Sequence, residues 1–288
     1  MCESSKQYEV LNWAFSFLQK NNREERVAEI LLQHLLGMSR SEYFANMQEN
    51  IGDSIIKQFK ADIHKHVMTG VPVQHITGYE EFFGREFEVN QHVLIPRFET
   101  EELVQHVIHI VEKNLAENQP VTIVDVGTGS GIIGITLALE LANATVYATD
   151  ISTQALQVAK RNAKKHGANI QFVQGNFLEG ITEYCNPHVI VSNPPYIAET
   201  ERDFLSDTVK NFDPDLALFA SNNGLAAYHE IIGQIASLSD RSERYICFEI
   251  GYTQSSAVTT ILEQKLSPKQ IKTIKDLNGK DRIISAQL

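Results

Sequence analysis

The sequence predicts an α/β fold in which a mostly parallel β-sheet with helices on both faces follows a small all-α domain. From residue 121 onward, apolar runs of strand length alternate with segments whose apolar residues recur at helical spacing. Residues 8–68 show the helical spacing alone. Near the C-terminus, Asn278 and Gly279 form a strong turn signal between two strand-like runs. We therefore expect an antiparallel terminal hairpin to close the sheet.

The sequence pattern of residues 1–78 predicts a separate helical domain. Their apolar residues recur at the spacing of several short amphipathic helices, and no strand pattern interrupts them. Gly37 stands where the C-terminus of a helix favours glycine. Ser39 and Glu42 have the spacing of a capping box, which favours the start of another helix.

A β-hairpin is predicted in the linker that follows, residues 79–96. Strand-like residues flank Gly84 and Arg85, which we expect to form the turn. The last four residues of the linker are expected to be extended. Acidic residues just beyond the linker favour a helix N-terminus near Glu99.

The second domain is predicted to span residues 97–288. Its expected strands are residues 121–126, 145–149, 170–173, 188–191, 245–250, 270–275 and 282–287. Its expected helices after the first are residues 131–141, 152–166, 225–236 and 254–265. A long polar segment, residues 199–223, separates two of these elements, and connections of this length are usually functional or mobile.

Composition excludes several classes of protein. The net charge is −11, the pI is about 5.4, and no run of Lys or Arg is present, so we expect no direct binding to nucleic acid. The three cysteines lie far apart and no His/Cys cluster has ligand spacing, so we expect no metal. No run approaches the roughly 18 apolar residues of a membrane span. We therefore expect a cytoplasmic protein that does not bind membranes.

A glycine-rich turn follows the first predicted strand of the sheet and opens a helix. Its residues are Gly127, Thr128, Gly129, Ser130 and Gly131. Glycines at this place let a ligand approach the backbone and the N–H groups of the helix. Asp150 ends the next strand, where a carboxylate can accept both hydroxyls of a ribose. These features predict a nucleoside site.

Two kinds of nucleoside ligand fit this turn. Residues 129–134 match the GxGxxG pattern, so a dinucleotide is one of them. Asp125, however, would add negative charge beside a pyrophosphate, whereas it can pair with, or hydrogen-bond near, the ammonium of an amino acid. A nucleoside joined to an amino acid is therefore favoured, and S-adenosylmethionine is such a ligand.

Asn176 and Phe177 follow the third predicted strand of the sheet. The carboxyl ends of the strands of an open sheet line one crevice, so Asn176 can reach an adenine amine and Phe177 can stack on the ring. A turn residue and a core aromatic explain the pair equally well.

The fourth strand ends in a rigid polar stretch, Asn193, Pro194, Pro195 and Tyr196. Residues that precede proline are held extended, and proline has no N–H, so the backbone here presents carbonyls with few competing donors. The Asn193 side chain adds an amide and Tyr196 adds a flat ring. This stretch, which we call the acceptor ledge, suits a planar group that carries an NH2, such as a carboxamide or a base.

Residues 125–131, Asp150 and the acceptor ledge resemble the cofactor and catalytic motifs of class I methyltransferases that act on planar nitrogen. Other stretches narrow this resemblance to the HemK-type release factor glutamine N5-methyltransferases (PrmC family). They are residues 74–78, 82–84, 94–101, 248–252 and 279–282, so the resemblance covers nearly the whole chain. The chain departs from the family pattern at Phe98, where proline is more familiar, and at Phe177, where tryptophan can occur.

The resemblance implies a Rossmann-like methyltransferase domain that transfers a methyl group from S-adenosylmethionine to the glutamine of the GGQ loop in class 1 peptide chain release factors. Asn193, Pro194 and Tyr196 are then the catalytic residues, and with Pro195 they bind the substrate amide. The cofactor-binding residues are Gly127, Thr128, Gly129, Ser130, Gly131, Asp150, Phe177 and Asn193. Residues 1–78 become a substrate-recognition domain.

Other functions remain compatible with the residues. The nearest alternative is glutamine methylation of a ribosomal protein, and a more distant one is methylation of an amino group on a nucleic-acid base. Two further alternatives are a non-enzymatic S-adenosylmethionine sensor and an NAD-dependent oxidoreductase.

Overall fold

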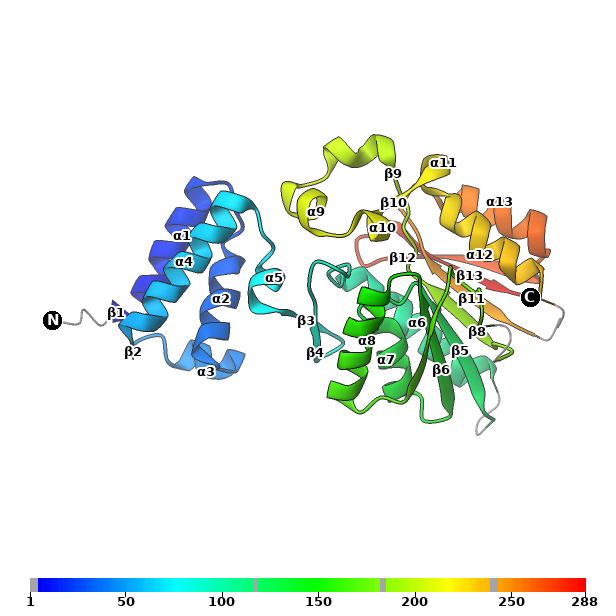
Figure 1. The fold of residues 1–288 in the computed structure, drawn as a ribbon, viewed down its shortest axis with the longest axis horizontal. Coiled ribbons are helices and arrows are strands. Elements are labelled where there is room, and N and C mark those ends of the chain that lie inside the picture. Colours follow the sequence, from blue (N-terminus) through cyan, green and yellow to red (C-terminus); the bar gives the residue numbers. More distant parts are fainter. Residues whose placement is uncertain (1–4, 116–118, 182–184, 239–242) are drawn as a thin grey trace. The chain divides into compact units, whose positions relative to one another are not determined.

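The computed structural model describes residues 5–115, 119–181, 185–238 and 243–288. The chain divides into two compact units (Figure 1). One unit contains Met1–Gly78 together with Ser206–Phe212, and the other contains Tyr79–Leu205 and Asp213–Leu288. The sequence-based division at residue 78 did not include the short segment 206–212 in the first unit.

The first unit is built from helices around one apolar core. Its helices are α1 (Gln7–Lys20), α2 (Arg26–Leu36), α3 (Arg40–Ala45), α4 (Asp53–Thr69), α5 (Val73–Thr77) and α9 (Asp207–Phe212). Gly37 ends α2 in the left-handed conformation at φ 62°, as its position predicts. The capping box at the start of α3 is formed, with Ser39 accepting from the Glu42 N–H and Glu42 accepting from the Ser39 N–H.

The expectation that no strand interrupts residues 1–78 was wrong at one place. The two-residue strands β1 (Ser5–Lys6) and β2 (Asn50–Ile51) pair antiparallel. Segments this short carry no alternation of apolar and polar residues, so the sequence held no signal for them.

An ion pair holds α9 within the first unit. The Arg23 guanidinium donates two hydrogen bonds to the Asp207 carboxylate, at 2.8 and 2.7 Å. These bonds lower the pKa of Asp207 to about 2. The chain therefore leaves the second unit after Leu205, contributes α9 to the first unit, and returns at Asp213.

The second unit contains a seven-stranded sheet in the order β12-β13-β11-β8-β5-β6-β7. Its strands are β5 (Val121–Val126), β6 (Ala144–Asp150), β7 (Ile170–Gln174), β8 (Val189–Ser192), β11 (Tyr245–Glu249), β12 (Gln270–Lys275) and β13 (Asp281–Gln287). All pairs are parallel except those of β13 with β11 and β12. The predicted sheet and terminal hairpin are confirmed, and each strand end lies within one residue of its expected position.

Helices pack on both faces of this sheet (Figure 1). Helices α6 (Phe98–Asn114), α7 (Ile132–Glu140) and α8 (Thr153–His166) contribute to one apolar cluster, and α12 (Ala226–Ala236) and α13 (Ser255–Leu266) contribute to the other. Successive strand residues point to opposite faces, so Val189 and Val191 belong to the first cluster and Ile190 belongs to the second. Burial on both faces explains why the central strands β5, β8 and β11 are largely apolar.

The predicted hairpin is present as β3 (Tyr79–Phe82) and β4 (Arg85–Glu88). Its turn, however, is formed by Phe83 and Gly84, at φ 54° and 70°, and not by Gly84 and Arg85. The Phe83 N–H donates to the Glu101 carboxylate of α6 at 2.7 Å, a long-range contact that the local sequence could not reveal.

The long polar segment consists of short elements and not of a structureless loop. Besides α9, they are the 3-10 helix η1 (Glu199–Phe204), α10 (Asp215–Leu218), β10 (Phe219–Ala220) and most of α11 (Ser221–Gly224), and the short strand β9 (Ile197–Ala198) directly precedes them. Strands β9 and β10 pair parallel. Within the second unit, the Arg202 guanidinium binds Asp215 and lies 3.9 Å from the centre of the Phe219 ring.

Candidate active site

A cavity in the second unit opens at the carboxyl ends of β5, β6, β7 and β8. Most of the predicted site residues line it, namely Gly127, Thr128, Gly129, Ser130, Asp150, Phe177, Asn193, Pro194 and Pro195. Gly131 and Tyr196 do not line it. The topology explains the gathering, because parallel strands bring the loops after their carboxyl ends to one edge of the sheet.

Asp125 does not act as its position had suggested. Its side chain is fully buried and is absent from the cavity wall, so it does not pair directly with a ligand in the cavity, and hydrogen bonding near the ammonium stays a prediction. The carboxylate instead accepts hydrogen bonds from the Thr128 hydroxyl at 2.5 Å and from the Gly134 N–H at 2.9 Å. Burial raises its pKa to about 6. Asp125 therefore holds the glycine-rich turn from beneath.

Gly131 lies where the packing of two helices leaves no room for a side chain, and its predicted contact with the cofactor stays a prediction. Its φ of +87° lies in the left-handed region, and a Cβ atom there would lie 2.7 Å from the Ile135 side chain. The same Cβ would come within 3.1 Å of Ala159 on α8. Glycine at this position thus allows α7 to begin close against α8.

Asp150 connects the glycine-rich turn to the end of β6. It accepts hydrogen bonds from the Gly129 N–H at 2.9 Å and from the Ser152 N–H at 2.8 Å. Burial raises its pKa, and these backbone donors oppose that shift. The carboxylate is thereby fixed in the cavity wall, where its remaining lone pairs can accept from a ligand hydroxyl.

Asn176 and Phe177 both line the cavity, as the ligand-binding interpretation expects. Phe177 also packs against the apolar cluster beneath α12 and α13, so the alternative of a core aromatic stays open. Phe177 adopts a left-handed backbone conformation at φ 57°, which is unusual for a residue with a side chain. Gln234 of α12 holds this turn by donating to the Asn176 carbonyl at 3.2 Å and accepting from the Leu178 N–H at 2.7 Å.

The two departures from the family pattern, Phe98 and Phe177, lie in different places relative to the cavity. Phe98 is the first residue of α6, is 62% exposed and is absent from the cavity wall. The Phe98 side chain therefore does not itself contribute to the wall of the cavity. Phe177 does line the cavity, so it supplies an aromatic ring where the family pattern also allows one.

The acceptor ledge is held by contacts on both sides. Ser192 at its start donates to the Val126 carbonyl at 2.7 Å, which joins the ends of β8 and β5. Gln254 donates to the Tyr196 carbonyl at 2.9 Å. Gly224 packs so closely on the same carbonyl that no side chain would fit. These contacts therefore add to the rigidity that the two prolines give the acceptor ledge.

Neither the Asn193 Oδ1 atom nor the Pro194 carbonyl has a hydrogen-bond partner among the described residues. The Asn193 Nδ2 atom, in contrast, donates to the Thr100 hydroxyl at 3.2 Å. Two acceptors are thus available beside the cavity. A planar NH2 group has two N–H donors that match them.

Three residues that the sequence analysis did not assign also shape the site. Thr100 lines the cavity, and buried Glu249 accepts a hydrogen bond from it at 2.7 Å. Asp213 accepts from the Arg97 guanidinium at 2.8 Å, which fixes the start of α10 beside the cavity. Burial raises the pKa of Asp213, and Arg97 lowers it. Thr100 and Glu249 fall in family-like stretches, but only the fold brings them together.

Neither a metal-binding cluster nor a membrane-spanning helix is found among the described residues. In the described ranges, no group of His, Cys, Asp or Glu side chains could hold a metal ion. No helix in the part of the chain that the structure describes is long and apolar enough to cross a membrane.

Two protein-family models match this chain, one in its N-terminal part and one in the part that contains the sheet. The family model "PrmC N-terminal domain" matches residues 9–78, and "Methyltransferase small domain" matches residues 105–235. The N-terminal domain of human METTL16, solved in complex with SAH, has a TM-score of 0.52 and 17% identity, covering 71% of this chain and 75% of that chain. This last likeness shows the fold of the second unit to be that of a methyltransferase.

Two curated relatives match almost the whole chain. The release factor glutamine methyltransferase of Bacillus subtilis is 45% identical over 280 residues, which cover 97% of this chain and 96% of the relative. That of Bacillus cereus is 41% identical over 282 residues, covering 98% and 99%. The chain belongs to the release factor glutamine methyltransferase family.

Proposed function

We propose that this enzyme transfers a methyl group from S-adenosylmethionine to the side-chain amide nitrogen of the glutamine in the GGQ loop of class 1 peptide chain release factors. The observation that carries the proposal is the pair of available acceptors, Asn193 Oδ1 and the Pro194 carbonyl. Both residues border the cavity that contains the glycine-rich turn and Asp150. A carboxamide nitrogen bound there lies beside the cofactor.

The cofactor is S-adenosylmethionine, and the residues of the cavity fit it. The Asp150 carboxylate, fixed by two backbone N–H groups, can accept the ribose hydroxyls. Asn176 and Phe177 offer a polar edge and a flat face for adenine. When bound, S-adenosylmethionine supplies an electrophilic methyl group on a positively charged sulfur.

The main task of the chain is to position a poor nucleophile. The lone pair of an amide nitrogen is delocalised into its carbonyl, so holding the nitrogen in line with the methyl group is the largest contribution that the site can make. Asn193 Oδ1 and the Pro194 carbonyl each accept one N–H of the substrate. Both oxygens also stabilise the positive charge that grows on nitrogen during the transfer. Tyr196, whose pKa is raised by burial, stays neutral and supports the ledge.

We also propose that the first unit recognises the protein substrate. A pocket shaped for one carboxamide distinguishes glutamine from other residues, but it does not distinguish one glutamine from another. Phe44 and Met68 are large apolar side chains of this unit that are 49% and 77% exposed. Such side chains can contribute to a docking surface. Because release factors act in translation, the proposal places the enzyme in the cytoplasm.

Mass spectrometry of the GGQ peptide tests the proposed function. The enzyme is incubated with S-adenosylmethionine and an intact class 1 release factor, and we expect one added methyl group on the glutamine. Ribosomal proteins, RNA and DNA are treated in parallel. Methylation of one of these, with an unmodified release factor, would overturn the proposal.

The role of the acceptor ledge has its own test. Asn193→Ala removes one of the two acceptors, so we expect kcat to fall by at least about tenfold, because a lost hydrogen bond to a charge-developing group contributes roughly 1.5–3 kcal/mol. Near wild-type kcat in this variant would show that Asn193 does not hold the substrate amide.

A further inference from the structure

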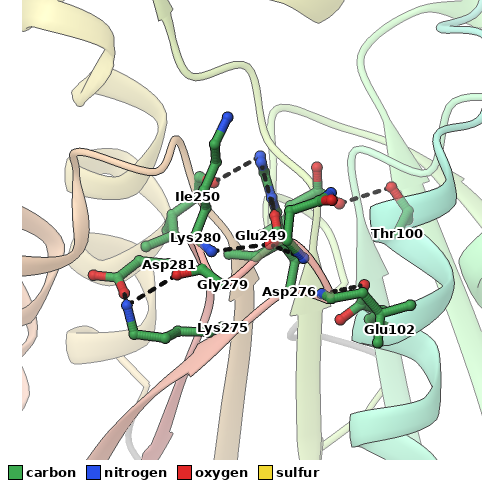
Figure 2. Close-up of polar contacts among 12 residues, drawn as sticks. Thr100, Glu102, Glu249, Ile250, Lys275, Asp276, Gly279, Lys280 and Asp281 are labelled. Atoms are coloured by element: carbon green, nitrogen blue, oxygen red, sulfur yellow. Dashed lines mark hydrogen bonds and ion pairs between the residues drawn. The ribbon is translucent and has the colours of Figure 1, made fainter.

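The Asn193 side chain is connected to a buried carboxylate through one hydroxyl group. Asn193 Nδ2 donates to Thr100 Oγ1 at 3.2 Å, and Thr100 Oγ1 donates to Glu249 Oε2 at 2.7 Å. Figure 2 shows the Glu249 side chain directed at Thr100 on α6. Both Thr100 and Glu249 are 1% exposed. The contacts between them are therefore shielded from competing water.

The order of donors and acceptors in this chain has a physical cause. A hydroxyl group has one proton, and Thr100 gives it to the Glu249 carboxylate, which can only accept. Thr100 then has only lone pairs left for Asn193. The two ends of an asparagine amide are nearly identical in shape, so steric fit alone does not choose between them. The Thr100 hydroxyl therefore determines the orientation of the Asn193 amide, because it can accept from Nδ2 and cannot donate to Oδ1.

We infer that Thr100 and Glu249 are positioning residues that orient the Asn193 amide so that its Oδ1 atom faces the substrate nitrogen. The inference deepens the proposed function and rests on it. In the reverse orientation Asn193 would present N–H groups to the N–H groups of the substrate. Such a site would repel the amide that it must hold. A buried carboxylate thus determines the polarity of a side chain that it does not touch.

Glu249 also meets the other end of the acceptor ledge. The Tyr196 hydroxyl donates weakly to Glu249 Oε1 at 3.4 Å, and the Tyr228 hydroxyl of α12 donates to the Glu249 carbonyl at 2.8 Å. The charged groups that act on the carboxylate are Arg282 of β13 and Glu99 of α6. Burial raises the pKa of Glu249 to about 7, while Thr100 and Arg282 oppose the shift.

Protonation of Glu249 is expected to remove the fixed orientation. A neutral carboxyl can donate its proton to Thr100, and the Thr100 hydroxyl is then able to donate to Asn193 Oδ1. The amide of Asn193 can now turn without losing a hydrogen bond. Catalysis should therefore weaken as the pH falls through the pKa of Glu249.

The first test removes and then restores the hydroxyl. Thr100→Val keeps the shape of the side chain but breaks the connection, so we expect kcat for release factor methylation to fall about tenfold or more. Thr100→Ser should recover most of this loss. The far-UV circular dichroism spectrum should match that of the wild type in both variants, which shows that they are folded.

The matched control is Thr136→Val. Thr136 of α7 is also fully buried, but its hydroxyl has no partner among the described residues and it does not line the cavity. We expect its kcat to be unchanged. The inference would be overturned if kcat fell equally in Thr100→Val and Thr136→Val. It would also be overturned if kcat of Thr100→Ser were as low as that of Thr100→Val.

The second test is the pH profile of kcat. The wild-type enzyme should lose activity as the pH falls below about 7, the pKa to which burial raises Glu249. Glu249→Gln carries no titrating group and can both donate and accept, so its kcat should be lower than wild type at pH 8 and flat across the acidic range. An acidic limb that is identical in the two enzymes would contradict the role of Glu249.

The two failures can be told apart. If the wild-type enzyme does not methylate the release factor, the proposed function itself is wrong. If the wild-type enzyme is active and Thr100→Val retains wild-type kcat, only the role of the positioning residues is wrong.

Discussion

The Gly129 N–H donates to Asp150 Oδ2 at 2.9 Å, which ties the turn after β5 to the end of β6. One carboxylate therefore has two tasks, because it shapes the glycine-rich turn and also lines the cavity. Asp125 fixes the same turn from the buried side through Thr128 and Gly134. The turn is held between two carboxylates, and such preorganisation lowers the ordering cost of binding a ligand.

The role of Asp150 can be measured through cofactor affinity. Asp150→Ala removes the acceptor for the ribose hydroxyls and one anchor of Gly129, so we expect the Kd for S-adenosylmethionine to rise by about 10- to 100-fold. Isothermal titration calorimetry measures this change. Glu263→Ala, which removes an exposed carboxylate on α13, serves as the control. An unchanged Kd in Asp150→Ala would exclude the ribose assignment.

Gly131 should be intolerant of any side chain. Gly131→Ala combines left-handed backbone strain, roughly 1–2 kcal/mol, with overpacking against Ile135 and Ala159, about 1–3 kcal/mol. Urea denaturation should show the sum as a loss in the free energy of unfolding. Gly167→Ala is the matched variant, because Gly167 has φ +68° but no atom within 4 Å of the added Cβ. Equal losses in the two variants would show that packing at Gly131 is irrelevant.

The sheet was predictable because its central strands β5, β8 and β11 are buried apolar runs and its edge strands β7 and β12 alternate polar and apolar residues. The site was predictable where its residues follow strand ends, as with Asp150 and Asn193, because the topology of a parallel sheet gathers those positions. Thr100 and Glu249 could not be found in this way, since they meet only when α6 packs beside β11. Asp125 was misjudged because sequence position does not reveal whether a carboxylate points into a cavity or into the core.

Replacing Thr136 with valine should stabilise the protein. Its buried hydroxyl has no partner among the described residues, and leaving such a group unsatisfied costs roughly 1–3 kcal/mol. Thr136→Val replaces the hydroxyl with a methyl group of similar size, so we expect the free energy of unfolding to rise by about 1 kcal/mol. Differential scanning calorimetry reads this change as a higher Tm. Thr100→Val makes the same chemical change at a partnered hydroxyl and should lower Tm instead, so a fall in both variants would disprove the explanation.

Glu249 should make the protein less stable as the pH rises. Its pKa is about 7 in the folded chain against a reference value of 4.5, so the folded state holds a proton that the unfolded state has already lost. The resulting stabilisation is complete below about pH 4.5 and disappears as the pH rises through 7. By the linkage relation it amounts to at most about 3 kcal/mol.

Glu249→Gln removes this titration. Relative to wild type, its free energy of unfolding should therefore increase between pH 5 and pH 8, although the variant is expected to be less active. Urea denaturation across this range measures the difference, and Glu263→Gln, at an exposed position, should show none. Asp125, whose pKa is raised to about 6, acts in the same direction in both enzymes and cancels in the comparison. A pH-independent difference between Glu249→Gln and wild type would mean that the buried carboxylate is already ionised at pH 5.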